Sequence, residues 1–514
     1  MEKNRVVLEI GQDEYWWCGI IDFSYQMPFT KATELHFDMT TGPYEALCVN
    51  QITPTFLSSH GRYAYMKDFG SFTFKDGKLT LESDGEIDCG QKSSLKEACL
   101  YINNKIAPPT GKTPPTVCFT APQYCTWMEL LYGQNQEEVL AYARRIVAEG
   151  MPVGEFIIDD GWQEYYGHWD FDKRKFPEPE KMCQELIELG FKVVLWIAPY
   201  VSPDSEVYRA LKDKDCLIKN PDGKPFITEW WDGYSAVVDF SHPVGREWFA
   251  EQYRFLHEKY GICGLKMDGG DTLYYPKFRS GAKNLTALEH CQAYGDFDCD
   301  MEIKELRACV KNTNRPIIQR VADRKHSWDR QRGLGGIVDR VILQGLMGYP
   351  FNCPDMVGGG LIEDELVGTK LTEELYCRYA QASTFLPSFQ LSKFFWKNSE
   401  TLTQAVHTMA KRHYELAPYM EGLLKNAATT GEPIVRNLAY EFNQRADIVD
   451  EFMLGDKYLV APILQEGARS RVIYLPKLTE GKWKYLPTGE LFDGGQEREF
   501  AADLMTLPYF ERVI

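Results

Sequence analysis

Hydrophobic and polar residues alternate over short distances in the first 115 residues. Runs such as Arg5–Ile10, Gly70–Phe74 and Lys78–Glu82 are separated by Gly, Asp and Asn, a pattern typical of β-strands joined by turns. Residues 107–115 (Ala-Pro-Pro-Thr-Gly-Lys-Thr-Pro-Pro) are rich in proline and predict a linker. We therefore expect an N-terminal β-sandwich over residues 1–115.

After the linker, short apolar runs alternate with amphipathic stretches. The stretches Gln136–Glu149 and Glu180–Leu189 carry apolar residues at helical spacing. The apolar runs predict strands at Val117–Thr120, Glu155–Ile158, Lys192–Ile197, Gly264–Met267, Pro316–Val321 and Arg340–Leu346. Strand–helix alternation sustained over this length favours parallel strands with crossover helices. A (β/α)8 TIM barrel over residues 116–425 is the leading prediction.

The pattern becomes β-like again near the C-terminus. Tyr458–Ile463, Arg471–Leu475 and Gly481–Tyr485 predict strands, and we expect a small C-terminal β-sandwich over residues 426–514. The fold class is thus α/β, a TIM barrel between two β-sandwiches.

Composition narrows the possible partners. The chain is 44% hydrophobic and 25% charged, as in folded proteins with a sizeable core. Its apolar run Val193–Pro199 is far shorter than the roughly 20 residues of a membrane-spanning helix. With 57 Lys and Arg against 74 Asp and Glu, the net charge is −17, which disfavours nucleic acid and anionic membranes. A neutral or cationic small molecule fits better.

The cysteine pattern and the N-terminal sequence indicate the cellular compartment of the protein. The 14 cysteines do not form CxxC pairs, which favours reduced thiols over a disulfide framework. Residues 1–17 show no positively charged and then apolar leader. We expect a cytoplasmic protein, and the sequence leaves its oligomeric state open.

Polar residues recur where the predicted barrel strands end. Catalytic residues of such barrels lie at the C-terminal ends of strands. The chain places Asp159, Asp160, Trp196, Asp268 and Asp323 at those positions, with Lys266 and Arg320 close by.

Carboxylates combined with tryptophan suit a sugar ligand. Asp accepts hydrogen bonds from hydroxyls, Trp covers the C–H face of a pyranose, and two carboxylates can act as acid and nucleophile. We expect Lys266 to keep Asp268 ionised and burial to raise the pKa of Asp323. A plainer interpretation stays open: an Asp at a strand end often caps the next helix, and Trp196 could be barrel packing.

The sequence does not match the common motifs for binding cofactors and metals. Gly111-Lys112-Thr113 resembles the end of a phosphate loop, but residue 106 is Ile and Pro114 follows. The chain has no HExxH and no His/Cys cluster. We expect no cofactor and no metal site, although a metal-dependent barrel enzyme remains an alternative of another class.

Several stretches resemble one family in the expected order. They are Gly264–Asp271 (GLKMDGGD), Asp323–Trp328 (DRKHSW), Gly348–Gly359 (GYPFNCPDMVGG), Leu386–Ser392 (LPSFQLS) and Phe452–Pro462. The chain resembles glycoside hydrolase family 31, with the closest likeness to its myogenesis-regulating branch. The resemblance implies a retaining, exo-acting α-glycosidase in which Asp268 is the nucleophile and Asp323 the general acid/base.

The resemblance also implies substrate contacts. The implied residues are Asp159, Asp160, Trp196, Trp231, Lys266, Arg320, Trp328, Asp355 and Gln390. Asp-Asp-Gly-Trp at 159–162 is similar to the segment with which α-galactosidases hold O4 and O6, and Gln390 stands where α-glucosidases have His. We therefore expect galactose at the cleaved position. An α-glucosidase or α-xylosidase of the same family, or a catalytically silent sugar-binding protein, remain alternatives.

Overall fold

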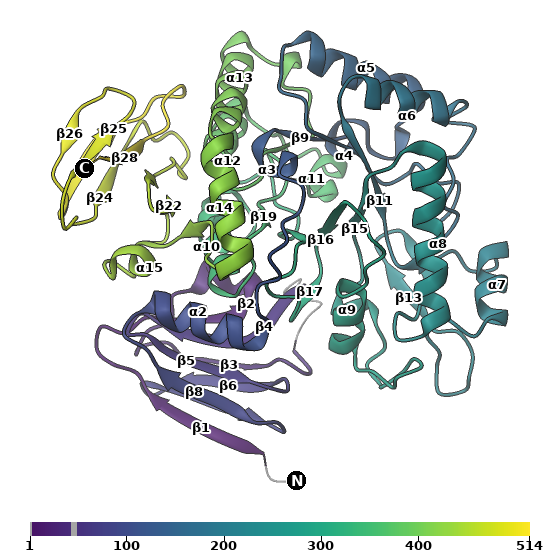
Figure 1. The fold of residues 1–514 in the computed structure, drawn as a ribbon, viewed down its shortest axis with the longest axis horizontal. Helices are drawn as coiled ribbons and strands as arrows, with labels where there is room; N and C mark the ends of the chain where they lie inside the picture. Colours follow the sequence, from purple (N-terminus) through teal and green to yellow (C-terminus); the bar gives the residue numbers. More distant parts are fainter. Residues whose placement is uncertain (1–2, 43–48, 514) are drawn as a thin grey trace.

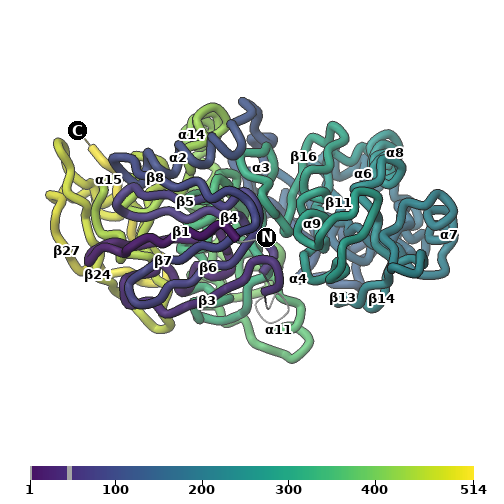
Figure 2. Tube along the Cα trace, turned by 90° about the horizontal axis from the view of Figure 1, so that it is seen from below, coloured from purple at the N-terminus to yellow at the C-terminus, as the bar shows by residue number. Residues whose placement is uncertain are grey.

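The computed structural model describes residues 3–42 and 49–513, and Figure 1 shows three units along them. The N-terminal sheets lie below the barrel, and the C-terminal strands lie beside α12–α14, on the side away from α7 and α8 (Figures 1 and 2). Cys48 and the outermost ends of the first and last predicted domains fall outside the described residues.

The N-terminal unit is the predicted β-sandwich, and alternation along its strands explains it. In β7 (Lys78–Ser83) Leu79 and Leu81 are buried, whereas Lys78, the first residue of the strand, is exposed. One sheet has the order β1-β7-β6-β3 and the other β17-β4-β5-β8, with β2 paired to β4. The elements are β1 (Asn4–Glu9), β2 (Trp16–Ile20), β3 (Leu35–Asp38), β4 (Gln51–Ser58), β5 (Arg62–Met66), β6 (Gly70–Lys75), β7, β8 (Ile87–Gln91) and α2 (Leu95–Ile106).

Eight parallel strands form the central barrel. They are β9 (Gln123–Cys125), β10 (Glu155–Ile158), β11 (Lys192–Ile197), β15 (Gly264–Met267), β16 (Ile303–Leu306), β18 (Ile318–Arg320), β19 (Asn352–Cys353) and β20 (Gln390–Leu391). From β9 to β19 each strand pairs with the next one along the chain, and β20 pairs with β9. A single parallel bridge between Met356 and Gln390 joins the two ends of this path, so the barrel is nearly closed.

Helices surround the barrel or lie over the ends of its strands. They are α3 (Val117–Thr120), α4 (Trp127–Leu130), α5 (Gln136–Ala148), α6 (Pro179–Glu188), α7 (Glu206–Asp213), α8 (Pro243–Tyr260), α9 (Ala287–Gly295), α10 (Ile337–Leu346), α11 (Ile362–Leu366), α12 (Glu373–Ser383), α13 (Glu400–Glu415) and α14 (Ala417–Thr430). In α5 the N-cap Asn135 accepts from the Glu138 amide, and Val139, Ala143 and Ile146 face the core.

The connection from β16 to β18 departs from the β/α rule. Residues 307–317 form no helix and instead supply β17 (Cys309–Val310). This strand leaves the barrel and pairs in parallel with β4 of the N-terminal unit. The segment that follows β16 therefore joins the N-terminal sheet directly after the C-terminal end of this barrel strand.

Two predicted strands are wrong. Val117–Thr120 is the helix α3, and Arg340–Leu346 belongs to α10. Every residue of α10 is buried, so the helix has no solvent-exposed face, and a short apolar run does not distinguish a buried helix from a buried strand. The runs at β10, β11, β15 and β18 are confirmed as strands.

A smaller three-stranded sheet extends over the barrel, and a C-terminal β unit follows it. The first contains β12 (Tyr200–Val201), β13 (Ile227–Trp230) and β14 (Gly233–Val237). The second contains β21 (Val435–Arg436), α15 (Leu438–Phe442), β22 (Phe452–Leu454), β23 (Tyr458–Val460), β24 (Ser470–Leu475), β25 (Lys482–Tyr485), β26 (Leu491–Phe492), β27 (Gln496–Ala501) and β28 (Tyr509–Val513). The helix α14 crosses residue 425, the expected end of the barrel domain.

Candidate active site

Charged side chains meet at the C-terminal ends of four barrel strands. Asp159 follows β10, Asp268 follows β15, Arg307 follows β16 and Asp323 follows β18. All four line one cavity of about 160 Å³. This volume is well below the roughly 300–1,000 Å³ of sites for drug-sized ligands, and it suits one sugar ring.

Asp268 is buried and bound by three side chains. Trp196 donates from Nε1 to Oδ2 at 3.0 Å, while Arg307 and Arg320 lie 3.1 and 3.3 Å from Oδ1. Burial by itself raises the pKa of Asp268, but the two guanidinium groups and then Lys266 outweigh it and lower the pKa. Asp268 is therefore an anion, as a nucleophile requires.

The backbone turns sharply directly after Asp268. Gly269 and Gly270 both have positive φ, 62° and 67°, and a Cβ on Gly269 would lie 2.7 Å from the Tyr200 ring. The two glycines let the chain leave the strand without covering the carboxylate.

Asp323 shares its cations with Asp268. Arg320 donates to its Oδ1 at 2.5 Å, and Arg307 lies 3.6 Å from its Oδ2. Because one guanidinium, that of Arg320, contacts both carboxylates, the two acids converge on one point. Burial and the charge of Asp268 raise the pKa of Asp323. The charges of Arg320 and Arg307 lower it by more, so the pKa of Asp323 lies below its usual value. The expectation that its pKa is raised is wrong, because two cations face it.

Arg307 is a site residue that the sequence did not indicate. Its guanidinium also lies 2.7 Å from Asp271 and covers the Trp231 ring at 4.8 Å from the centroid. It follows β16, whose Lys304 and Glu305 break the apolar run, so no strand was predicted there. The available signal was the long gap between β15 and β18, which leaves room for one more strand of the barrel.

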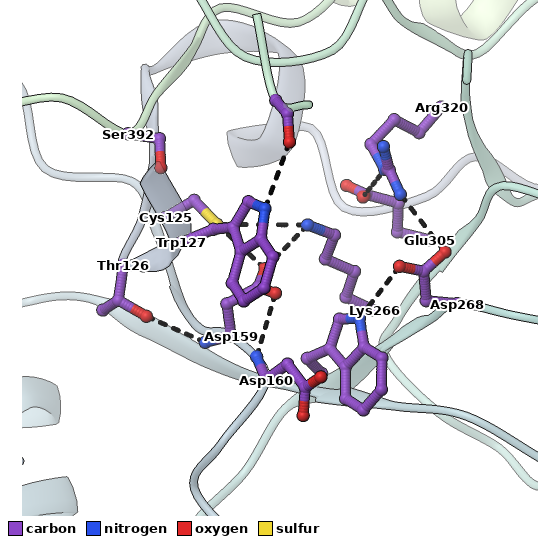
Figure 3. Close-up of polar contacts among 12 residues, drawn as sticks. Cys125, Thr126, Trp127, Asp159, Asp160, Lys266, Asp268, Glu305, Arg320 and Ser392 are labelled. Atoms are coloured by element: carbon purple, nitrogen blue, oxygen red, sulfur yellow. Dashed lines mark hydrogen bonds and ion pairs between the residues drawn. The ribbon is translucent and has the colours of Figure 1, made fainter. Parts of the chain in front are cut away.

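Lys266 contacts Asp159 directly (Figure 3), whereas it acts on the pKa of Asp268 through its charge. Its Nζ lies 2.7 Å from Asp159 Oδ2, and the Cys125 thiol donates to the same oxygen at 3.0 Å. Burial lowers the pKa of Lys266, but the charge of Asp159 outweighs it and raises the pKa. The predicted effect of Lys266 on Asp268 is present, but it ranks behind those of the two arginines.

Asp160 belongs to a second carboxyl pair at the cavity wall. Tyr166 donates its hydroxyl proton toward Asp160 and Asp232, at 3.1 and 2.8 Å. Burial, followed by the charge of Asp232, raises the pKa of Asp160 well above its usual range. Gln134 fixes the turn by donating to the carbonyl oxygens of Asp159 and Asp160, both at 2.6 Å.

Tryptophans supply apolar walls. Trp127, Trp196 and Trp231 line the cavity, and Trp196 is almost fully buried while Trp231 is 37% exposed. Trp231 stands at the turn between β13 and β14, where its ring can cover a ligand at the mouth.

Three expected substrate contacts do not line the cavity. Trp328 packs as a partly buried side chain against the core. Asp355 is buried behind Arg320, at 3.3 Å, and accepts from the amides of Arg324 and Gly360. Gln390 lies inside the barrel and donates to Gln123 at 3.1 Å. Asp355 and Gln390 are thus corrected to residues that support the site from within.

Further lining residues were not predicted. They are Asn50, Trp127, Asp271, Leu273, Tyr274, Arg307, Ala322, Arg332, Met356, Leu361, Ile362 and Glu363. Asn50 comes from the N-terminal unit, so the site is not built by the barrel alone.

Residues 3–42 and 49–513 also bear on metal binding, membrane insertion and disulfide bonding. No group of three or more His, Cys, Asp or Glu side chains in these ranges is arranged to hold a metal ion. No helix within them is long and apolar enough to cross a membrane. The cysteines of the same ranges are free thiols.

Comparison with known proteins identifies the domains. Residues 112–315 match the glycosyl hydrolases family 31 TIM-barrel domain, and residues 431–513 match the glycosyl hydrolase family 31 C-terminal domain. Together the two ranges cover more than half of the chain.

Individual relatives agree with these domains. The myogenesis-regulating glycosidase of Mus musculus is 31% identical over 78% of this chain and 57% of its own length. Alpha-glucosidase 2 of Bacillus thermoamyloliquefaciens is 26% identical over 73% of this chain and 50% of its own length. The chain thus spans about half the length of the curated relatives it matches. A GH31 alpha-xylosidase from a soil metagenome, solved with xylose, shares the fold with a TM-score of 0.80 and 22% identity over 99% of this chain and 79% of that one.

Proposed function

The chain belongs to glycoside hydrolase family 31, and on this premise we propose that it hydrolyses α-glycosides with retention of the anomeric configuration. The observation that carries the proposal is the convergence of Asp268 and Asp323 on the Arg320 guanidinium inside a cavity for one sugar ring. Two carboxylates on either side of one bond are what a double displacement needs.

In the first step Asp268 attacks the anomeric carbon and the glycosidic C–O bond breaks. Asp323 gives its proton to the departing oxygen, so the aglycone leaves as a neutral alcohol. The sugar is then held as a β-linked ester on Asp268 and Asp323 is an anion. Arg307 and Arg320 face both carboxylates, and their attraction moves from Asp268 to Asp323 as the charge does.

In the second step water replaces the aglycone. Asp323 takes one proton from the water while the oxygen attacks the anomeric carbon from the opposite face, and the bond to Asp268 breaks. The product has the α configuration, and both carboxyl groups return to their starting protonation states.

We propose galactose as the sugar and an exo-acting mode. Asp159 and Asp160 line the same cavity as the catalytic pair, and their oxygens suit the O4 and O6 hydroxyls of a sugar ring. The small volume supports removal of a single terminal residue, with Trp231 at the mouth. The alternative activities, α-glucosidase and α-xylosidase, differ only in which sugar hydroxyls donate hydrogen bonds to these side chains.

One observation favours a second candidate, a sugar-binding protein without turnover. Asp323 must carry a proton to act as an acid, and the neighbouring arginines lower its pKa. A chain in which Asp323 stays ionised would bind a sugar and leave it intact.

A panel of aryl glycosides tests both candidates. We expect release of the phenol from the α-galactoside in preference to the α-glucoside, the α-xyloside and the N-acetyl-α-galactosaminide, and α-galactose as the first product seen by NMR. Calorimetric binding of a sugar without release of any phenol would establish the second candidate instead.

A nucleophile variant completes this test. Asp268→Ala lowers kcat by at least about 10³-fold, because the covalent step is lost, and its circular dichroism is unchanged. Asp213→Ala, at the exposed end of α7, is the matched control and keeps full activity. Wild-type turnover in Asp268→Ala would contradict the assignment of the nucleophile.

A further inference from the structure

The residue that precedes β4 (Gln51–Ser58) reaches the catalytic end of the barrel. Asn50 lines the cavity, and its carbonyl accepts the Cys309 amide at 2.8 Å. The Ile52 carbonyl accepts the Lys311 amide at 3.1 Å in the same parallel pairing. The segment that follows Arg307 is therefore added to the N-terminal sheet as a strand.

The Gln51 side chain makes a second connection at the same place. It is fully buried, and its Nε2 donates to the carbonyl of Arg307 at 2.9 Å and to that of Arg320 at 2.6 Å. Its Oε1 accepts from Gln344 Nε2 at 2.7 Å. Both amide protons and the amide oxygen are engaged, which fixes the orientation of the group.

The two carbonyls lie just past the end of a strand ladder. Pairing of β16 with β18 ends at Leu306 and Gln319, and the next residue on each strand is an arginine. Past that point, the side chains of the two arginines share contacts with Asp268 and Asp323, and the Gln51 amide adds a connection between their backbones. One amide from another structural unit continues the ladder by one position.

We infer that Gln51 is a positioning residue for the reaction, and that it sets the spacing of Arg307 and Arg320 against the two catalytic carboxylates. The inference rests on the proposed function. Gln51 does not line the cavity, so it acts through the arginines, and its loss affects the chemical step more than substrate binding. A displacement of about 1 Å at such a site can cost about 10²-fold in rate.

The test compares two buried amides that join the N-terminal unit to the barrel. Gln51→Met keeps the length of the side chain and removes both donors. Asn103→Leu is the matched control, because Asn103 donates to the Leu346 carbonyl at 2.9 Å and is buried away from the cavity. We expect Gln51→Met to lower kcat by about 10- to 100-fold with KM within about threefold of wild type, and Asn103→Leu to leave both constants unchanged.

Crystal structures of the two variants give a reading that does not depend on turnover. Gln51→Met displaces the Arg307 and Arg320 guanidinium groups from the carboxylates, and Asn103→Leu leaves them in place. If the wild type hydrolyses no glycoside of the panel, the proposed function fails while this comparison still decides the positioning role.

A milder variant tests the inference if Gln51→Met does not fold. Gln51→Asn keeps an amide that is too short to span both carbonyls, and it lowers kcat by an intermediate factor. Unmoved arginines in Gln51→Met or Gln51→Asn, or equal losses of kcat in Gln51→Met and Asn103→Leu, would overturn the inference.

Discussion

At the scale of single residues, Asp323 combines two opposing demands. A proton donor must hold a proton at the working pH, yet Arg320 and Arg307 favour its charged form. The same cations make Asp323 a stronger acid once it is protonated, because they stabilise the anion left after transfer. In the proposed reaction the two arginines thus add driving force for proton transfer from Asp323 and reduce the fraction of Asp323 that is protonated.

This balance predicts an acidic optimum for kcat/KM. Asp268 must be ionised and its pKa is lowered, so activity persists as the pH falls. Asp323 must be protonated and its pKa is also lowered, so activity is lost as the pH rises, below neutrality. Rate profiles with an alkyl glycoside measure both limbs, which belong to the coupled pair. Arg307→Met weakens the attraction and moves the alkaline limb to higher pH; an unmoved limb would contradict this explanation.

Removal of the acid should depend on the leaving group. Asp323→Ala lowers kcat/KM by about 10²- to 10⁴-fold for alkyl glycosides, which need a proton on the departing oxygen. A dinitrophenyl glycoside, whose phenolate leaves without a proton, loses far less. Azide should restore turnover of this variant and give an α-glycosyl azide. Equal losses for both substrates would show that Asp323 is not the acid.

The strand pattern by itself predicts site residues only where they follow an apolar strand, and Trp231 was expected from the family resemblance instead. Asp159, Asp268 and Asp323 follow such strands, and the structure brings them to one cavity. Arg307 follows a strand with charged residues inside the barrel, and Asn50 comes from another unit, so neither carries a local signal. Gln390 stands in a recognisable motif but points into the barrel, because side-chain direction depends on the position in the closed sheet.

At the scale of elements, the polar interior of the barrel explains the missed strand. Glu305 of β16 is buried at 3.2 Å from Arg320, and the nearby Glu155 of β10 has a pKa raised to about 8 by burial and by Glu305. Charged residues at inward positions remove the apolar pattern on which strand prediction relies. Strands such as β7 alternate buried and partly exposed residues, and these are easier to predict.

The β13–β14 hairpin gives a prediction at this scale. Trp231→Ala removes the ring at the mouth and raises KM by about 3- to 10-fold, the range expected for one aromatic platform. Trp231→Phe recovers most of the loss. Tyr234 is 61% exposed on the same hairpin and does not line the cavity, so Tyr234→Ala is the control. A similar KM in all three variants and the wild type would rule out contact between the hairpin and substrate.

At the scale of the whole molecule, the N-terminal unit is joined to the barrel by buried polar contacts. Besides Gln51, Ser24 donates to Asp339 at 2.9 Å, and Asp22 pairs with Arg340 at 3.1 Å. Asp22 also accepts the backbone amide of Asn50 at 3.1 Å. The pair of Asp22 and Arg340 therefore supports the segment that enters the active site.

Loss of Arg340 should destabilise the protein in a pH-dependent way. Burial raises the pKa of Asp22 although Arg340 opposes it, and Arg340→Met removes the opposition, so the pKa rises further. A carboxyl whose folded-state pKa is raised favours folding at low pH and loses that contribution as the pH rises through the pKa. The loss in free energy of unfolding caused by Arg340→Met is therefore largest at neutral pH, about 3–5 kcal/mol, and it becomes smaller toward pH 5.

Thermal unfolding across this pH range measures the deficit as a shift in Tm. Asp22→Asn combined with Arg340→Met recovers much of the loss at neutral pH, because no charge is left unpaired. Arg144→Met, which breaks the exposed pair with Glu185, changes Tm little at any pH, since exposed ion pairs contribute about 0–1 kcal/mol. A deficit of Arg340→Met that stays constant with pH would mean that Asp22 does not carry a buried charge. The contact between the two units would then depend on packing and on the hydrogen bonds of Gln51 and Ser24.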